Sequence, residues 1–284
     1  HAAITVSALG SLTGGRDIEI RTGGGADTLQ ITGALQTTTG NIILNLANSQ
    51  TASTQVIDLI DGGFSAGGNL ELRITGTGRA DIQMEGAFSA GGHVLTSTGS
   101  GRDTITATAT FTGASLYFLT GNGSDTIALT GTLTATAGDV LFDLGTDGDL
   151  LDQLTVSGTI AASRDILMYK LPQTAVSAIV GVSQPVYVAK GNLVRVTTDN
   201  RSVVYEYLNS TNQQIDLGSA DYLNAAVWRE TTVNLDTSGQ TTIAVTGVAT
   251  LTAGRDIDIW TGGGDDSIAV AGLLKAQRDV RIRT

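Results

Sequence analysis

A short sequence pattern recurs nine times in this chain, at a spacing of roughly 25 residues. Each copy runs from a cluster of Gly and Asp into alternating apolar and polar residues, as in TGGGADTLQITGAL from Thr22 and TGNGSDTIALTGTL from Thr120. The first apolar residue of each copy falls at Ile4, Leu29, Ile57, Ile82, Ile105, Ile127, Leu154, Ile243 and Ile268. A repeat of this length predicts an architecture in which each unit buries its apolar face against its neighbours.

A second apolar start follows 11 to 14 residues after the first, for example at Ile18, Leu116 and Ile257. Both starts open an alternation that is typical of a strand with one buried face. The pattern therefore predicts two strands per unit, and like strands would stack in parallel about 4.8 Å apart. We expect an all-β fold, a parallel β-solenoid (β-helix) of about nine turns of roughly 25 residues with one irregular insertion.

Composition narrows the range of functions. The chain has 37 Gly but only 2 Pro, which favours tight turns between strands over a disordered linker. A net charge of −11 argues against a nucleic-acid partner, because phosphates require a basic surface. No apolar stretch reaches 18 residues, so we expect no membrane span. The absence of Cys excludes disulfides and thiolate metal sites.

The repeat is interrupted between Lys170 and Thr232, and the gap from Leu154 to Ile243 is 89 residues. Insertions in a solenoid map to a loop or side domain on one face, often a binding face. Two irregular turns with larger loops would explain the interruption equally well. We expect solenoid turns over residues 1–169, an irregular β insertion or side domain over 170–232, and resumed turns over 233–284.

The segment RDVRIRT at residues 278–284 nearly repeats RDIEIRT at 16–22, which a further turn follows. Two explanations are open. The chain is a segment of a longer array, or the half-turns at its two ends pair between subunits. In either case unpaired strand edges at the end of a solenoid promote end-to-end pairing.

Four stretches of nine residues, TGGGADTLQ, TGSGRDTIT, TGNGSDTIA and TGGGDDSIA, are similar to the Gly-Gly-x-Gly-x-Asp-x-apolar-x repeat of RTX (hemolysin-type) calcium-binding proteins. The phrases LTGGRDIEI and LTAGRDIDI resemble the turns of filamentous-haemagglutinin-type adhesins. Both families are secreted by Gram-negative bacteria and built from parallel β-coils. The resemblance implies an extracellular or cell-surface adhesin or filament. In RTX proteins the nonapeptides run in tandem, whereas here each stands alone, once per turn.

The RTX-like turns contain the candidate calcium ligands. These are Asp27, Asp103, Asp125 and Asp266, with Asp265 assisting. Calcium needs six to eight oxygens, and a stack of turns could supply one Asp per turn together with backbone carbonyls. In the alternative interpretation, each Asp accepts hydrogen bonds from turn N–H groups. A second acidic group resembles part of a calcium loop without its closing Glu, and a solvated acidic turn is its alternative. It comprises Asp143, Asp147, Asp149 and Asp152.

The sequence does not predict an enzyme. The only internal histidine, His93, stands at a repeat position, so no Ser-His-Asp set can be assembled without it. We expect a structural module of an extracellular filament, sheath or giant surface protein, whose partners are copies of itself or adjacent repeats stacked end to end. The alternative is a cell-surface adhesin that binds a glycan or protein receptor through its insertion. The candidate recognition residues are Tyr187, Arg201, Tyr205, Tyr207 and Trp228.

Overall fold

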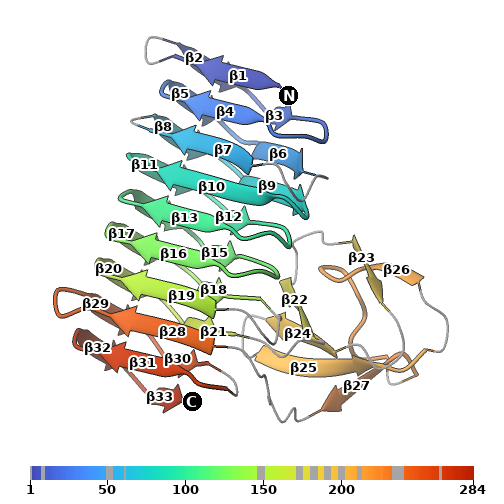
Figure 1. The fold of residues 1–284 in the computed structure, drawn as a ribbon, viewed down its shortest axis with the longest axis vertical. Coiled ribbons are helices and arrows are strands. Elements are labelled where there is room, and N and C mark those ends of the chain that lie inside the picture. The colour runs from blue at the N-terminus through green and yellow to red at the C-terminus, as the bar shows by residue number, and fades with distance from the viewer. Residues whose placement is uncertain are drawn as a thin grey trace.

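Three strands form each turn of the chain, and the turns stack into a parallel β-solenoid (Figure 1). The computed structural model describes residues 2–7, 10–48, 54–60, 62–145, 151–170, 175–179, 185–188, 193–197, 202–209, 213–224, 226–231, 240–261 and 264–284. These residues contain strands and turns and no helix, hence no helix that is long and apolar enough to span a membrane.

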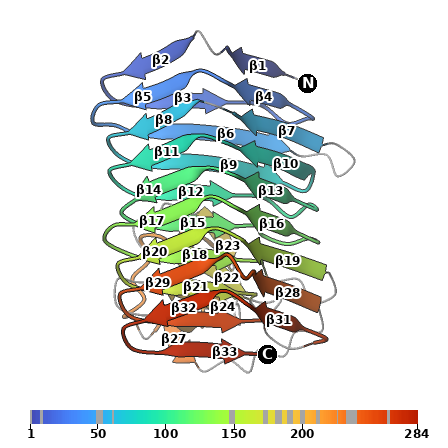
Figure 2. The ribbon, with the colours of Figure 1, turned by 90° about the vertical axis from the view of Figure 1, so that its left-hand side faces the viewer.

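The solenoid has three sheets of nine strands each, and Figure 2 shows them side by side. The first sheet contains β1 (Ala3–Val6), β4 (Thr28–Ile31), β7 (Thr54–Leu59), β10 (Arg79–Met84), β13 (Thr104–Ala107), β16 (Thr126–Leu129), β19 (Leu151–Val156), β28 (Gln240–Val245) and β31 (Ser267–Val270). The second contains β2 (Ser11–Gly14), β5 (Ala34–Thr37), β8 (Gly63–Ala66), β11 (Ala87–Ala90), β14 (Thr110–Gly113), β17 (Thr132–Ala135), β20 (Thr159–Ala162), β29 (Thr250–Ala253) and β32 (Leu273–Ala276). The third contains β3 (Ile18–Arg21), β6 (Ile42–Asn48), β9 (Leu70–Gly76), β12 (Val94–Ser97), β15 (Leu116–Leu119), β18 (Val140–Asp143), β21 (Ile166–Tyr169), β30 (Ile257–Trp260) and β33 (Val280–Arg283).

The predicted solenoid of about nine turns is confirmed, but the prediction of two strands per turn is wrong. The first apolar run of each unit folds into two strands, one in the first sheet and one in the second. Thr108 and Ala109 connect β13 to β14, and Ala109 points inward with 1% exposure. The inward-outward alternation therefore continues through the corner, so the bend leaves no break in the sequence pattern.

The core runs along the inside of the coil, where equivalent residues of successive turns lie on one another. The nine predicted anchors pair in succession from Ile4 to Ile268, each with its equivalent in the adjacent turn; Ile105 and Ile127 are one such pair. Rings stack in the same way: the centroids of Phe64 and Phe88 are 4.7 Å apart, and those of Phe88 and Phe111 are 4.9 Å apart. Stacked aromatic pairs contribute about 0.5–1.5 kcal/mol beyond the area they bury.

The interruption in the repeat corresponds to a separate set of strands beside the rod (Figure 1). One sheet has four strands in the order β22-β24-β25-β27, and β23 pairs with β26. Their bounds are β22 (Ala175–Ile179), β23 (Pro185–Val188), β24 (Leu193–Thr197), β25 (Ser202–Tyr207), β26 (Gln213–Asp216) and β27 (Trp228–Thr231). The solenoid continues directly across this segment, because β19 pairs with β28 and β21 pairs with β30.

Candidate functional site

The aspartates of the RTX-like turns occupy one position, two residues before the first-sheet anchor. Asp27, Asp103 and Asp125 are at most 2% exposed. Their Oδ1 atoms each accept a hydrogen bond from a backbone N–H of the preceding turn, donated by Ala2 at 2.7 Å, Ala80 at 2.7 Å and Asp103 at 2.8 Å respectively. The carboxylates therefore join successive turns in a buried ladder.

The last turn differs slightly. Asp266 occupies the ladder position, is half-buried and accepts the N–H of Thr241 at 2.9 Å. Asp265 lies one residue earlier and is exposed, so it does not belong to the ladder.

Asp152 is a ladder member that the sequence analysis assigned to a different cluster. It is completely buried and its Oδ1 accepts the N–H of Asp125 at 2.8 Å. Its spacing of two residues before Leu154 could have identified it. Asp143 does not belong to this ladder. It is buried at the end of β18, and its Oδ1 accepts the N–H of Gly145 at 3.0 Å. Asp147 and Asp149 of the proposed acidic loop lie outside the described residues.

The run Asp103–Asp125–Asp152 brings three carboxyl groups into consecutive turns, away from water. Lys170 is also completely buried, and its Nζ lies 2.6 Å from Asp152 Oδ2. Burial raises the pKa of Asp103 to about 6. Burial raises the pKa of Asp125 to about 9; the hydrogen bond from the Asp103 N–H opposes this shift, and the neighbouring carboxyls of Asp103 and Asp152 increase it. Asp125 is therefore protonated at neutral pH.

Backbone hydrogen bonding occupies one oxygen of each ladder carboxyl group. Calcium binds six to eight oxygens and is stabilised by ionised carboxylates. Each ladder aspartate uses Oδ1 for a backbone hydrogen bond, while the Oδ2 atoms of Asp27 and Asp266 are buried without a hydrogen-bond partner among the described residues. In the part of the chain that the structure describes, no three His, Asp or Glu side chains converge as a metal site. Binding of calcium stays a prediction from the resemblance alone.

A second ladder runs along the corner before the third sheet, and its members accept hydrogen bonds in the opposite direction. Asp17 Oδ1 accepts the N–H of Asn41 in the following turn at 2.7 Å, and Asn41 Oδ1 accepts that of Asn69 at 2.7 Å. An amide oxygen serves as well as a carboxylate here, which explains why both Asn and Asp occur at this position.

Arginines reinforce this second ladder in the later turns. The Nε of Arg164 donates to Asp139 at 3.0 Å, and the Nε of Arg255 donates to Asp165 at 3.1 Å. Arg278 donates in the same way to Asp256 at 3.1 Å. In each case an arginine of one turn binds the aspartate of the turn before it, so the dipeptide Arg-Asp is a connector between turns.

The inserted segment has a small aromatic core. Tyr207 is 0% and Trp228 is 3% exposed, with ring centroids 5.1 Å apart. The ring centroid of Tyr222 lies 4.9 Å from that of Trp228 and 5.1 Å from that of Tyr205. Two of the predicted recognition residues, Tyr207 and Trp228, are thus core residues, while Tyr205 is partly exposed.

Two further predicted recognition residues have no described side chain. Arg201 lies outside the described residues, and only the backbone of Tyr187 is described, in β23.

The outer face of the third sheet carries an apolar stripe that the sequence analysis did not identify. It consists of Leu95, Tyr117, Leu141, Leu167 and Tyr169, all at most 8% exposed although they point away from the solenoid core. Figures 1 and 2 show the inserted segment on this side of the rod. Because these outward-facing side chains are buried and the inserted segment lies on their side of the rod, we infer that the insertion covers this face.

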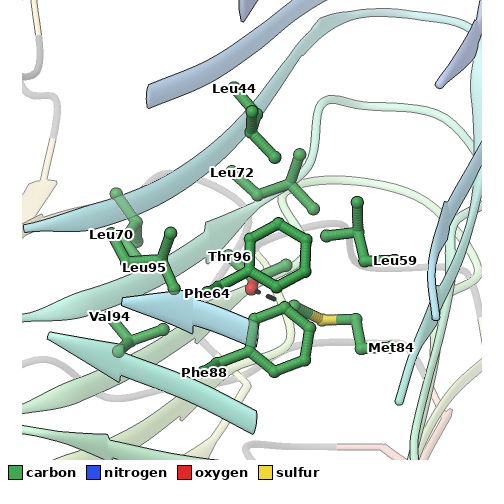
Figure 3. Close-up of a pocket in the computed structure, with 10 residues that line it drawn as sticks. All are labelled: Leu44, Leu59, Phe64, Leu70, Leu72, Met84, Phe88, Val94, Leu95 and Thr96. Carbon is green, nitrogen blue, oxygen red and sulfur yellow. Dashed lines mark hydrogen bonds between the residues drawn. The ribbon is translucent and has the colours of Figure 1, made fainter. Parts of the chain in front are cut away.

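A small cavity lies inside the coil rather than on its surface (Figure 3). Phe64, Phe88, Leu72 and Met84 contribute to its lining, and Thr96 is its polar member. The hydroxyl of Thr96 donates only to the thioether of Met84, at 4.0 Å. Apolar walls and enclosure within the core make this a packing defect rather than a binding site.

Comparison of the chain with protein families, curated proteins and solved structures finds no match.

Proposed function

We propose that this chain is a structural module of an extracellular or cell-surface filament, sheath or giant surface protein, assembled by end-to-end stacking of solenoid turns. The observation that carries the proposal is the continuous register of three parallel sheets through every turn. Turns of this kind add to one another without a change of geometry, because each contacts only its neighbours.

The two ladders support a mechanical role. Backbone hydrogen bonds connect turns, as from Ile18 N to Asn41 O at 2.9 Å, and side chains of both ladders add further bonds at the corners. A tensile force along the rod axis would act on all of the hydrogen bonds between two adjacent turns at the same time. In this proposal the chain is not an enzyme, because its buried polar groups serve to hold turns together.

The test is electron microscopy of native material with the intact mass of its polypeptide. Filaments of chains close to 29.1 kDa would indicate stacking of copies. Rods belonging to a much heavier polypeptide would indicate stacking of adjacent repeats within a giant surface protein. Single short rods of 29.1 kDa chains, with no stacking at any concentration, would overturn the proposal.

A second candidate function is adhesion to a glycan or protein receptor through the inserted segment. The observation that favours it is the insertion's own core and sheets beside the rod, with Tyr205 and Tyr222 partly exposed. Binding of the intact chain to a glycan array or host-cell surface, and its loss when the insertion is replaced by a short turn, would support adhesion. Equal binding by both chains would exclude the insertion as the adhesive surface.

A further inference from the structure

Lys170 and Asp152 form a completely buried pair between the two ends of a single turn. Both side chains are 0% exposed, and the Lys170 Nζ lies 2.6 Å from the Asp152 Oδ2. Asp152 lies in β19, the first strand of this turn, and Lys170 directly follows β21, its last strand. The pair therefore joins the start of the turn to its end, at the point where the chain leaves the solenoid for the inserted segment.

The surroundings of this pair exclude water. The residues equivalent to Lys170 in the adjacent turns are Leu144 and Thr261, and both are 0% exposed. The residue equivalent to Asp152 in the following turn is Thr241, which is 1% exposed. An ion pair in such a place has lost the solvation of both charges, so a reaction that removes the charges is favoured. Exclusion of water also protects the product from hydrolysis.

The carboxyl group of Asp152 is held in an orientation that suits attack by the amine. The backbone N–H of Asp125 donates to Oδ1 at 2.8 Å, while Oδ2 faces the Lys170 Nζ. A fixed N–H donor stabilises the negative charge that develops on a carboxyl oxygen during nucleophilic attack. Because a carbon–oxygen bond is about 1.2 Å long, Nζ lies within about 4 Å of the Asp152 Cγ. Reacting atoms in a near-attack arrangement are about 3–3.5 Å apart, so a small movement completes the approach.

We propose that Lys170 and Asp152 condense into an amide bond, an internal covalent cross-link of the folded chain. One proton passes from the Lys170 ammonium to Oδ2, and the neutral amine then attacks Cγ. The Nζ–Cγ bond forms, a second proton moves from Nζ to the departing oxygen, and the Cγ–Oδ2 bond breaks to release one water molecule. The reaction needs no oxidant and no further reactant, because the ion pair already contains every atom of the amide and the water. The inference goes beyond the proposed function and does not depend on it.

The cross-link would close residues 152–170 into a covalent ring. This turn is the one at which the chain leaves the rod, since the strand that pairs next with β19 is β28, on the far side of the insertion in sequence. A force transmitted through the inserted segment would otherwise separate β21 from its neighbours, beginning at Lys170. With the ring closed, the same force acts on a turn that cannot open.

The test is mass spectrometry of the purified, folded chain, both intact and after digestion with trypsin. The intact mass should be one water molecule below the mass calculated from the sequence. Trypsin should fail to cleave after Lys170, and a branched peptide should link that lysine to the peptide that contains Asp152. Lys170→Met and Asp152→Ala should each abolish the branched peptide and the mass deficit. Lys275→Met removes an exposed lysine of β32 and is the matched control, which should keep both.

Circular dichroism establishes that each variant is folded, and the branched peptide of the unaltered chain decides the matter even where a variant is not. The full sequence mass together with complete cleavage after Lys170 would overturn the proposal. So would a water loss that persists in Lys170→Met, because the dehydration would then lie elsewhere, for example at Asp147 before Gly148. None of these results bears on the stacking of turns, so the cross-link and the proposed function fail separately.

Discussion

Asp125 shows how a single buried carboxyl can set the pH range of the rod. Its folded pKa of about 9 lies above the ordinary value of 3.8, and the charged groups around it are Asp103, Asp152 and, beyond Asp152, Lys170. The protonated form is the one that the fold favours. Its contribution to stability is therefore complete below about pH 4 and is lost as the pH rises through about 9.

We predict that Asp125→Asn flattens this dependence, because an amide stays neutral and keeps an oxygen for the Asp103 N–H. The melting temperature of the unaltered chain should fall between about pH 4 and about pH 9 more than that of the variant. Asp58→Asn, on the outer face of β7, is the control and should leave the profile unchanged. Two results together would contradict this prediction: Asp125→Asn is less stable than the unaltered chain at every pH, and calcium raises the melting temperature of the unaltered chain. They would instead support a ladder of ionised carboxylates that binds a metal.

Gly121 explains why glycine recurs in the RTX-like turns. Its φ is +74°, and a Cβ at this position would lie 1.9 Å from the carbonyl oxygen of Gly99 in the preceding turn. The conformation alone costs a non-glycine residue about 1–3 kcal/mol, and the overlap with backbone adds to that cost. The glycines are needed for close stacking of turns, whether or not a cation is present.

We predict that Gly121→Ala lowers the free energy of unfolding by more than about 2 kcal/mol. Chemical denaturation measures this loss. Gly63→Ala is the matched control, because a Cβ there meets no atom within 4 Å and Gly63 lies in β8. Equal stability of the two variants would show that the turns can separate to admit a side chain.

At the scale of single residues, the sequence predicted positions better than roles. The repeat located Asp27, Asp103, Asp125 and Asp266 at one structural position, and the structure shows the backbone hydrogen bonds of the second interpretation; calcium binding there stays a prediction. Lys170 could not be predicted as their partner. It lies at a corner position of the turn where most other turns have Thr or a larger apolar residue, so the repeat gives no reason to expect a charged side chain there.

At the scale of strands, Thr96 of β12 is a polar residue at an inward position where the adjacent turns have apolar side chains. The equivalent residues of the adjacent turns are Leu72 and Phe118, which fill the coil. A hydroxyl whose only acceptor is a thioether gains little, and burying it without a good partner costs about 1–3 kcal/mol. This mismatch accounts for the internal cavity in Figure 3.

We predict that Thr96→Val stabilises the chain by about 1 kcal/mol, because it removes the buried hydroxyl and keeps the volume. Thermal and chemical unfolding measure the gain. Thr106→Val, at an exposed outward position of β13, is the control and should change stability by less than about 0.5 kcal/mol. A loss of stability in Thr96→Val would indicate that a water molecule or an unrecognised acceptor satisfies the hydroxyl.

Strand number was less predictable than strand position. The apolar–polar alternation continues without a break through the corner between the first and second sheets, so one periodic run of residues contains two strands. Strands such as β15 and β18 are apolar on both faces, which is typical of a sheet covered on both sides. That pattern was present in LYFL and VLFD, but periodicity alone gave no way to assign the outer cover to the inserted segment.

At the scale of the molecule, the insertion is not needed to form the solenoid, but it covers one of its faces. The solenoid strands pair directly across the insertion, so the rod has no topological need of it. The apolar stripe of Leu95, Tyr117, Leu141, Leu167 and Tyr169 does need a cover, because exposed patches of this kind promote association. The insertion therefore protects one side of the rod.

We predict that replacing the segment between Lys170 and Gln240 with a turn such as TGNGSD (residues 120–125) leaves a folded solenoid with an exposed apolar side. Far-ultraviolet circular dichroism should retain its β signal, while binding of the dye ANS rises and solubility falls. Adding Leu141→Thr and Leu167→Thr to the shortened chain removes the centre of the stripe and should reverse both changes. In the full-length chain the same two substitutions should instead lower stability, because they weaken a packed contact between rod and insertion. Unchanged ANS binding after the replacement would mean that the insertion is not the cover of this sheet.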